Sequence, residues 1–164
     1  MGLDHSIWDP QINEFDNTVL IYDILGHGKT PLNKNDLSFD DFSDQILNLM
    51  DELKFNKVHL VGFSIGSLIA RNFATRFNDR LASLTLLCSI FNRSDKEQKI
   101  VNDRFEQTKK DHKLTKDALK RWFTEDFLNK NPGISDKIFK ILQNNNMNNF
   151  IKIYSLFVKH QDNE

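Results

Sequence analysis

The feature that most constrains the fold is a short motif of glycine and serine between two segments of different periodicity. Residues 62–66 read GFSIG. They follow the apolar run KVHLV at 57–61, which is typical of a buried strand, and they precede a helical pattern over 65–77. Glycine on each side of the serine lets a strand and a helix approach closely. The motif therefore predicts a strand, a sharp turn and a helix in direct succession.

A serine on such a turn has the chemistry of a nucleophile. The turn imposes strained backbone torsions on Ser64 and holds its hydroxyl above the sheet. The amide of Ile65 starts the helix and can donate to a developing oxyanion in the same space. We predict Ser64 as the nucleophile and Ile65 as an oxyanion donor, on a turn formed by Gly62, Phe63 and Gly66. The alternative is that Ser64 only caps the helix and that the glycines only ease packing.

Other segments of the first half alternate between strand and helix patterns. The apolar runs TVLIY at 18–22 and LTLLC at 84–88 also predict buried strands. Ser38 and Asp41 form a start resembling a capping box for a helix over 39–53. Strands that alternate with helices form parallel sheets with right-handed crossovers. The expected fold class is therefore α/β.

The composition changes near residue 92, where Lys, Asp, Asn and Phe become frequent. The pattern is helical from there on, and the predicted helices cover 96–110, 115–129, 135–144 and 149–160. Turn residues at 132–133 and 144–146 separate them. We predict two parts, a partial α/β core over 1–92 and an all-helical segment over 93–164.

Composition limits the function classes. The 164 residues include 22 Lys and Arg against 23 Asp and Glu, so the chain lacks the basic excess typical of partners of nucleic acids or anionic membranes. Cys88 is the single cysteine and cannot form an internal disulfide, and no Cys or His cluster has zinc-site spacing. The sequence contains neither a signal-peptide pattern nor an apolar run long enough for a membrane span. We expect a cytoplasmic protein without a nucleic-acid, membrane or metal partner.

Several segments resemble the α/β-hydrolase superfamily. Residues 62–66 match its nucleophile motif Gly-x-Ser-x-Gly. Residues 22–30, YDILGHGKT, resemble the glycine loop after the superfamily's fourth strand, although Leu25 replaces a frequent arginine. Residues 2–11, GLDHSIWDPQ, resemble the segment after the oxyanion turn in the 3-oxoadipate enol-lactonase-like branch, and residues 121–132 resemble the cap of that branch.

This resemblance implies a serine hydrolase that cleaves a carboxylic ester or enol-lactone through an acyl-enzyme, with no metal or organic cofactor. It places a second oxyanion amide near Met1 and makes 93–164 a cap over the pocket of a small-molecule substrate. The pocket residues that it implies are Trp122, Phe123 and Phe127. The alternative is that these aromatic side chains only hold the cap helices together.

The resemblance also implies two catalytic partners for the serine. In the superfamily an acid and then a histidine follow the nucleophile, after later strands, whereas this sequence ends within the cap. His27, His160 and Asp95 are the substitutes to consider. One interpretation is a fragment of a longer hydrolase, and the other is a short non-catalytic binding or assembly module. In both cases open sheet edges favour self-association.

Overall fold

The computed structural model describes residues 1–160, which form two compact units. The first unit contains Met1, residues 33–103 and the chain from Lys152 onward. The second contains residues 2–32 and 104–151. These units are defined by how compactly the chain packs and not by function. The predicted core over 1–92 and cap over 93–164 therefore remain a prediction. The last four residues of that predicted cap lie outside the described residues.

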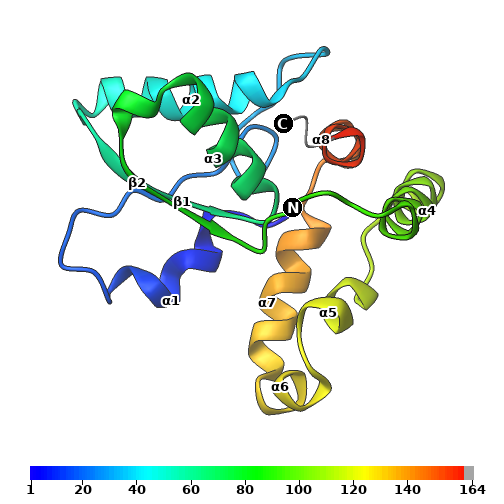
Figure 1. Cartoon of the computed structure of the whole chain (residues 1–164). Helices are drawn as coiled ribbons and strands as arrows, with labels where there is room; N and C mark the ends of the chain where they lie inside the picture. The colour runs from blue at the N-terminus through cyan, green and yellow to red at the C-terminus, as the bar shows by residue number, and fades with distance from the viewer. Residues whose placement is uncertain (161–164) are drawn as a thin grey trace. The chain divides into compact units, whose positions relative to one another are not determined.

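The first unit is built on a parallel strand pair with a helical crossover (Figure 1). Strand β1 spans Val58–Phe63, helix α3 spans Ile65–Arg76, the short η2 spans Asn78–Arg80 and β2 spans Leu81–Leu87. The two strands pair in parallel with Phe63 opposite Leu87. The strands predicted at 57–61 and 84–88 are thus confirmed, with shifted ends, and so is the predicted helix that follows the motif. The expected burial of these strands is wrong, because most residues of β2 and several of β1 are exposed.

Helix α2, Phe39–Glu52, lies beside α3 and buries its apolar stripe (Figure 1). The capping box predicted at its start is confirmed. The Asp41 carboxylate accepts a hydrogen bond from the Ser38 amide, and the Ser38 side chain accepts one from the Asp41 amide. Phe42 of α2 and Phe73 of α3 are both 0% exposed. Burial of such large aromatic side chains supplies much of the free energy that holds the two helices together.

The second unit is mostly helical. Its short N-terminal elements are η1, His5–Trp8, and α1, Asp9–Ile12. Its later helices are α5, Asp117–Trp122, α6, Glu125–Lys130, and α7, Pro132–Gln143, which lie close together in Figure 1. The core of this unit contains Ala118, Leu119 and Leu142, with partly buried apolar side chains around them: Leu3, Leu114, Phe123, Ile138 and Phe139.

The single helix predicted over 115–129 is wrong. The chain leaves the helical conformation at Phe123, which has φ −130° and ψ 148°. Thr124 then caps α6, since its hydroxyl accepts a hydrogen bond from the Phe127 amide at 3.2 Å. A capping side chain inside a continuous apolar pattern therefore divides the segment into α5 and α6.

The other predicted helices are confirmed, with small shifts at their ends. They are α4, Asp95–Asp111, α7, and α8, Met147–Lys159. The guanidinium of Arg93 donates to the Phe157 carbonyl at 3.1 Å and so satisfies part of the C-terminal end of α8. Within residues 1–160, none of the helices has the length and apolar character that crossing a bilayer requires.

The strand predicted at 18–22 is wrong. A strand exists only where a neighbour accepts and donates its backbone hydrogen bonds. Within residues 1–160 the sheet contains only β1 and β2, and residues 18–22 have no regular structure. Val19 and Leu20 are 37% and 42% exposed. The apolar pattern is typical of a buried strand, but the partner that would pair with it and bury it is not among the described residues.

Candidate active site

The candidate nucleophile lies on a strained turn between β1 and α3. Ser64 has φ 55° and ψ −120°, a combination that non-glycine residues rarely adopt. Its amide donates to the Leu87 carbonyl at 2.9 Å, and its own carbonyl accepts from the Ser67 amide at 2.9 Å. Such torsions cost about 1–3 kcal/mol and persist only where neighbouring bonds fix them. These two hydrogen bonds provide that restraint.

The Ser64 side chain is not a helix cap. Ser64 occupies the N-cap position of α3, yet its hydroxyl makes no capping hydrogen bond. The interpretation of Ser64 as a structural cap is therefore wrong. Ile65 is the first residue of α3, where backbone amides have no carbonyl partner within the helix and carry the positive end of its dipole. A half-buried hydroxyl next to such amides can serve as a nucleophile with an oxyanion donor.

The two glycines of the motif have different roles. A Cβ atom on Gly62 would lie 2.3 Å from the Gly66 carbonyl oxygen and 2.8 Å from the Ser67 Cα, so β1 and α3 approach too closely for any side chain there. A Cβ atom on Gly66 would meet nothing within 4 Å. The expected need for glycine is confirmed at Gly62. At Gly66 it is wrong, because the close approach involves only the backbone of that residue.

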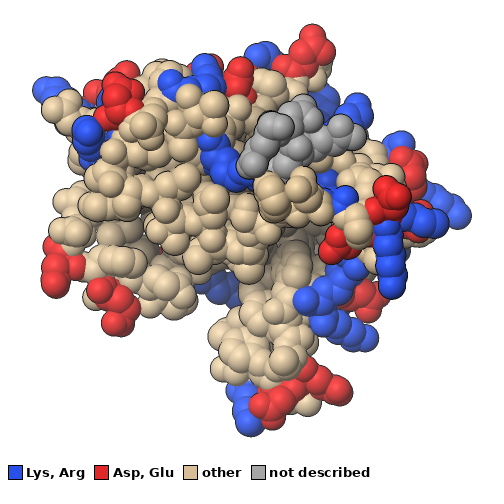
Figure 2. Space-filling view, viewed as in Figure 1, with Lys and Arg blue, Asp and Glu red and all other residues tan. Residues whose placement is uncertain are grey.

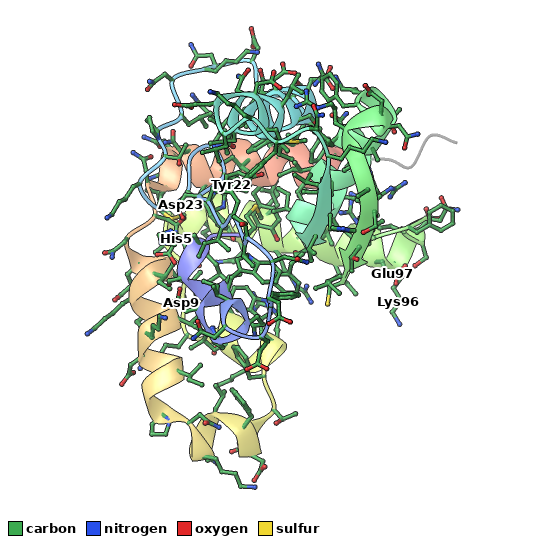
Figure 3. All side chains as sticks on the ribbon, turned by 90° about the vertical axis from the view of Figure 1, so that its left-hand side faces the viewer. His5, Asp9, Tyr22, Asp23, Lys96 and Glu97 are labelled. Atoms are coloured by element: carbon green, nitrogen blue, oxygen red, sulfur yellow. The ribbon has the colours of Figure 1, made fainter. Side chains whose placement is uncertain are left out.

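A second organised region lies in the other compact unit, around the carboxylate of Asp23. Figure 3 shows His5 beside Asp23. The carboxylate accepts hydrogen bonds from the His5 amide at 2.7 Å, from the His5 ring at 2.9 Å and from the Lys29 amide at 2.9 Å. Burial alone raises the pKa of Asp23, but these hydrogen bonds outweigh it and hold the pKa below its ordinary value. Asp23 is thus an ionised anchor for the glycine loop.

His27 is held in the same region as a neutral group. Its Nε2 accepts from the Gly2 amide at 2.9 Å, and its Nδ1 is 3.3 Å from the Leu25 carbonyl, to which it donates. The side chain is 2% exposed. Burial lowers the pKa of His27 to about 4. Because both ring nitrogens are engaged, His27 does not have the free acceptor that a general base needs, and it serves instead to position Gly2.

The other predicted site residues lie in separate surroundings. Burial lowers the pKa of the Met1 amino group to about 6, and an oxyanion role for Met1 remains a prediction. The His160 ring packs edge-on against Phe39 with ring centroids 5.3 Å apart, and Asp95 begins α4. These positions do not identify His160 as the base or Asp95 as the acid of a serine hydrolase.

The predicted pocket aromatics lie together at the junction of α5 and α6. Phe123 stacks on Phe127 with ring centroids 5.1 Å apart and also packs against the core of its unit. Trp122 and Phe127 are 42% and 37% exposed. Phe123 thus has at least a structural role, and contact of any of the three with a substrate remains a prediction.

Comparison with known proteins decides the family. The sequence model of the "alpha/beta hydrolase fold" family matches residues 2–139. The chain belongs to this family. It is 27% identical over 161 residues to the (E)-2-((N-methylformamido)methylene)succinate hydrolase of Acinetobacter baylyi, covering 97% of this chain and 60% of that protein. It is also 27% identical over 146 residues to 3-oxoadipate enol-lactonase 1 of the same organism, covering 87% of this chain and 54% of that protein.

Solved structures agree on the fold. The enol-lactonase of Burkholderia xenovorans LB400 matches with a TM-score of 0.80 at 23% identity, over 98% of this chain and 62% of that one. A hydrolase from Pseudomonas aeruginosa matches with a TM-score of 0.82 at 18% identity, also over 98% of this chain and 62% of that one. This α/β-hydrolase chain therefore spans about 60% of the length of such relatives.

The different roles of the two glycines can be tested by matched substitutions. Gly62→Ala places a methyl group against the Gly66 carbonyl, so we expect it to lower the free energy of unfolding by about 3 kcal/mol. Gly66→Ala adds a methyl group in open space on a helix, so it should be neutral or stabilising by about 0.5 kcal/mol. Urea unfolding of both variants measures the difference. Equal destabilisation would contradict the assigned close contact.

The buried neutral His27 predicts a pH-dependent stability. In the unfolded chain histidine has its ordinary pKa near 6.5, whereas the folded pKa is about 4, so between these values the unfolded state binds more protons. Stability therefore falls as the pH falls. We expect a loss of about 1.5 kcal/mol between pH 6.5 and pH 5. His27→Asn should have a lower free energy of unfolding at pH 7, and that free energy should fall less as the pH is lowered. If urea unfolding gives the same pH dependence for the variant and the unsubstituted chain, His27 is not the group responsible.

Proposed function

We propose that this chain carries the nucleophile of a serine hydrolase that cleaves a carboxylic ester or an enol-lactone. The observation that supports this most directly is Ser64 itself, which has strained torsions at the junction of β1 and α3 and a hydroxyl that does not cap the helix. The Ser64 oxygen attacks the substrate carbonyl and loses its proton to a base, the leaving oxygen takes a proton, and an acyl-enzyme results. Water then releases the acid and restores the hydroxyl. The Ile65 amide, and a second amide near Met1, stabilise the oxyanion.

The base and the acid of this mechanism are proposed to come from a part of the fold that the sequence does not span. The state of His27 supports this, because a substitute base would need a free ring nitrogen and both nitrogens of the buried His27 ring have hydrogen-bond partners. In the proposed whole enzyme, residues 93–164 act as the cap, and Trp122, Phe123 and Phe127 contribute apolar pocket wall. The exposed rings of Trp122 and Phe127 are available for such a contact.

A small organic substrate fits the relatives and the surface. The similar A. baylyi proteins act, by their names, on a succinate derivative and on an enol-lactone. On the face shown in Figure 2, acidic and basic side chains are interspersed rather than gathered in a basic stripe, which favours a small molecule over a nucleic acid. We also propose a cytoplasmic location, supported by the exposed and unpaired Cys88.

The nucleophile assignment predicts a specific loss on substitution. In the polypeptide that spans the whole fold, Ser64→Ala should abolish labelling by a fluorophosphonate probe and should lower kcat/KM for p-nitrophenyl acetate by about 10³-fold or more. Intact mass and steady-state kinetics measure these effects. Ser135→Ala, a serine on α7, is the matched control and should behave as the unsubstituted protein. Ester turnover unchanged by Ser64→Ala would show that the assignment is wrong.

A second candidate function is a non-catalytic binding or assembly module, and exposure of the sheet favours it. Large apolar side chains on both strands are more than a third exposed: Val61, Phe63, Leu84, Leu86 and Leu87. Parallel strands are normally covered on both faces, and an uncovered strand offers its backbone groups to another chain. The sheet is therefore a surface on which copies of this chain can associate.

This surface predicts concentration-dependent association. Leu84 and Leu86 lie two residues apart on β2 and so share one face of the sheet. We expect the 19.2 kDa chain to show a mass that rises with concentration in light scattering, and Leu84→Lys with Leu86→Lys to return it to the monomer mass. Asn102→Lys on α4 is the control for added charge. A monomer at all concentrations would argue against the assembly function.

A further inference from the structure

The helical unit contains a pocket that the proposed chemistry does not use. It lies between the loop at 112–116, the C-terminal end of α7 and Met147, and its volume is about 440 Å³. This volume falls in the range of small-molecule sites. All its lining residues belong to one compact unit.

The apolar part of the pocket lining is called its floor here. It is formed by Leu114, Phe139, Leu142 and Met147. Leu142 is 2% exposed and belongs to the unit's core, against which Leu114 and Phe139 pack. Because the core fixes Leu114, Phe139 and Leu142, this part of the floor does not have to form when a ligand arrives. An apolar body that replaces water there gains free energy in proportion to the area that it covers.

The polar part of the lining is called the rim here, and it is basic. It carries His112, Lys113 and Lys116, together with the polar Thr115 and Gln143. The Lys116 ammonium is 3.6 Å from an Asp136 oxygen and 5.2 Å from the centre of the Phe139 ring, so its charge is partly neutralised and held above the floor.

Lys113 differs from Lys116. Throughout residues 1–160 it has neither an ion pair nor a hydrogen bond, although it lines the same pocket. No acidic side chain is among the lining residues. The pocket lining therefore combines apolar side chains with an exposed lysine whose charge no ion pair within the described residues neutralises.

We propose that this pocket binds a small organic carboxylate with an apolar body. The Lys113 ammonium receives the carboxylate as a charge-assisted hydrogen bond, and the apolar body lies on Leu114, Phe139 and Met147. A neutral molecule of the same shape gains only the apolar contact. A compact inorganic anion gains only the charge, because it leaves the floor uncovered. Binding at this site does not require Ser64 to be reactive.

The test is titration of the folded chain with 4-phenylbutyrate, followed by amide chemical shifts in NMR, with 4-phenylbutyramide as the neutral control. We expect shifts at 112–116 and at Met147, and about tenfold weaker binding of the amide. Lys113→Gln should weaken binding of 4-phenylbutyrate by about tenfold and leave binding of the amide unchanged. Lys120→Gln, which alters a lysine on α5 outside the pocket, is the matched control.

Three outcomes would overturn the proposal. They are equal binding of the acid and the amide, binding unaffected by Lys113→Gln, and the absence of shifts at 112–116 in a chain that circular dichroism shows to be folded. Ser64→Ala should bind 4-phenylbutyrate as the unsubstituted chain does. A failure of the nucleophile assignment would therefore leave this result unchanged, and a failure of the pocket would leave Ser64 labelling unchanged.

Discussion

The candidate active site depends on the contact of Gly62 with the backbone of Gly66. With no room for a Cβ atom on Gly62, the end of β1 lies directly against the first turn of α3. The residues between them must then reverse direction within a single turn, and Ser64 adopts φ 55° and ψ −120°. The bond from its amide to the Leu87 carbonyl connects the same turn to the end of β2. One missing side chain thus determines where the serine lies and which way its backbone faces.

In the glycine loop of the second unit, a missing side chain likewise allows a close approach, in this case to the carboxylate of Asp23. A Cβ atom on Gly28 would lie 2.2 Å from an Asp23 carboxylate oxygen, so glycine lets the loop close over that group. The carboxylate in turn accepts from the amides of His5 and Lys29, which come from either side of it in sequence. The loss of this charge would leave several donors unsatisfied in a buried position. In both units, glycine is found where the backbone itself must contact a polar group.

The sequence predicted the features that depend on near neighbours. The turn around Ser64, the capping box of Ser38 and the helical stripes could all be recognised, because each depends on residues within about four positions. The strand at 18–22 could not, since pairing depends on a partner distant in the sequence. The buried state of His27 could not be predicted either, because it depends on a hydrogen bond from Gly2, which is 25 residues away along the chain. The pocket near Lys113 similarly combines segments about 25 to 30 residues apart.

Sheet completion and nucleophile geometry are physically linked. The Leu87 carbonyl restrains Ser64, and Leu87 itself is 40% exposed at the end of β2. A further strand paired with β2 would restrain the backbone at Leu87, and so would hold the strained serine more firmly. A strained residue persists only when its surroundings fix it. The proposed assembly through the exposed sheet and the proposed nucleophilic role of Ser64 are therefore linked, because covering the sheet would also support the turn that holds the serine.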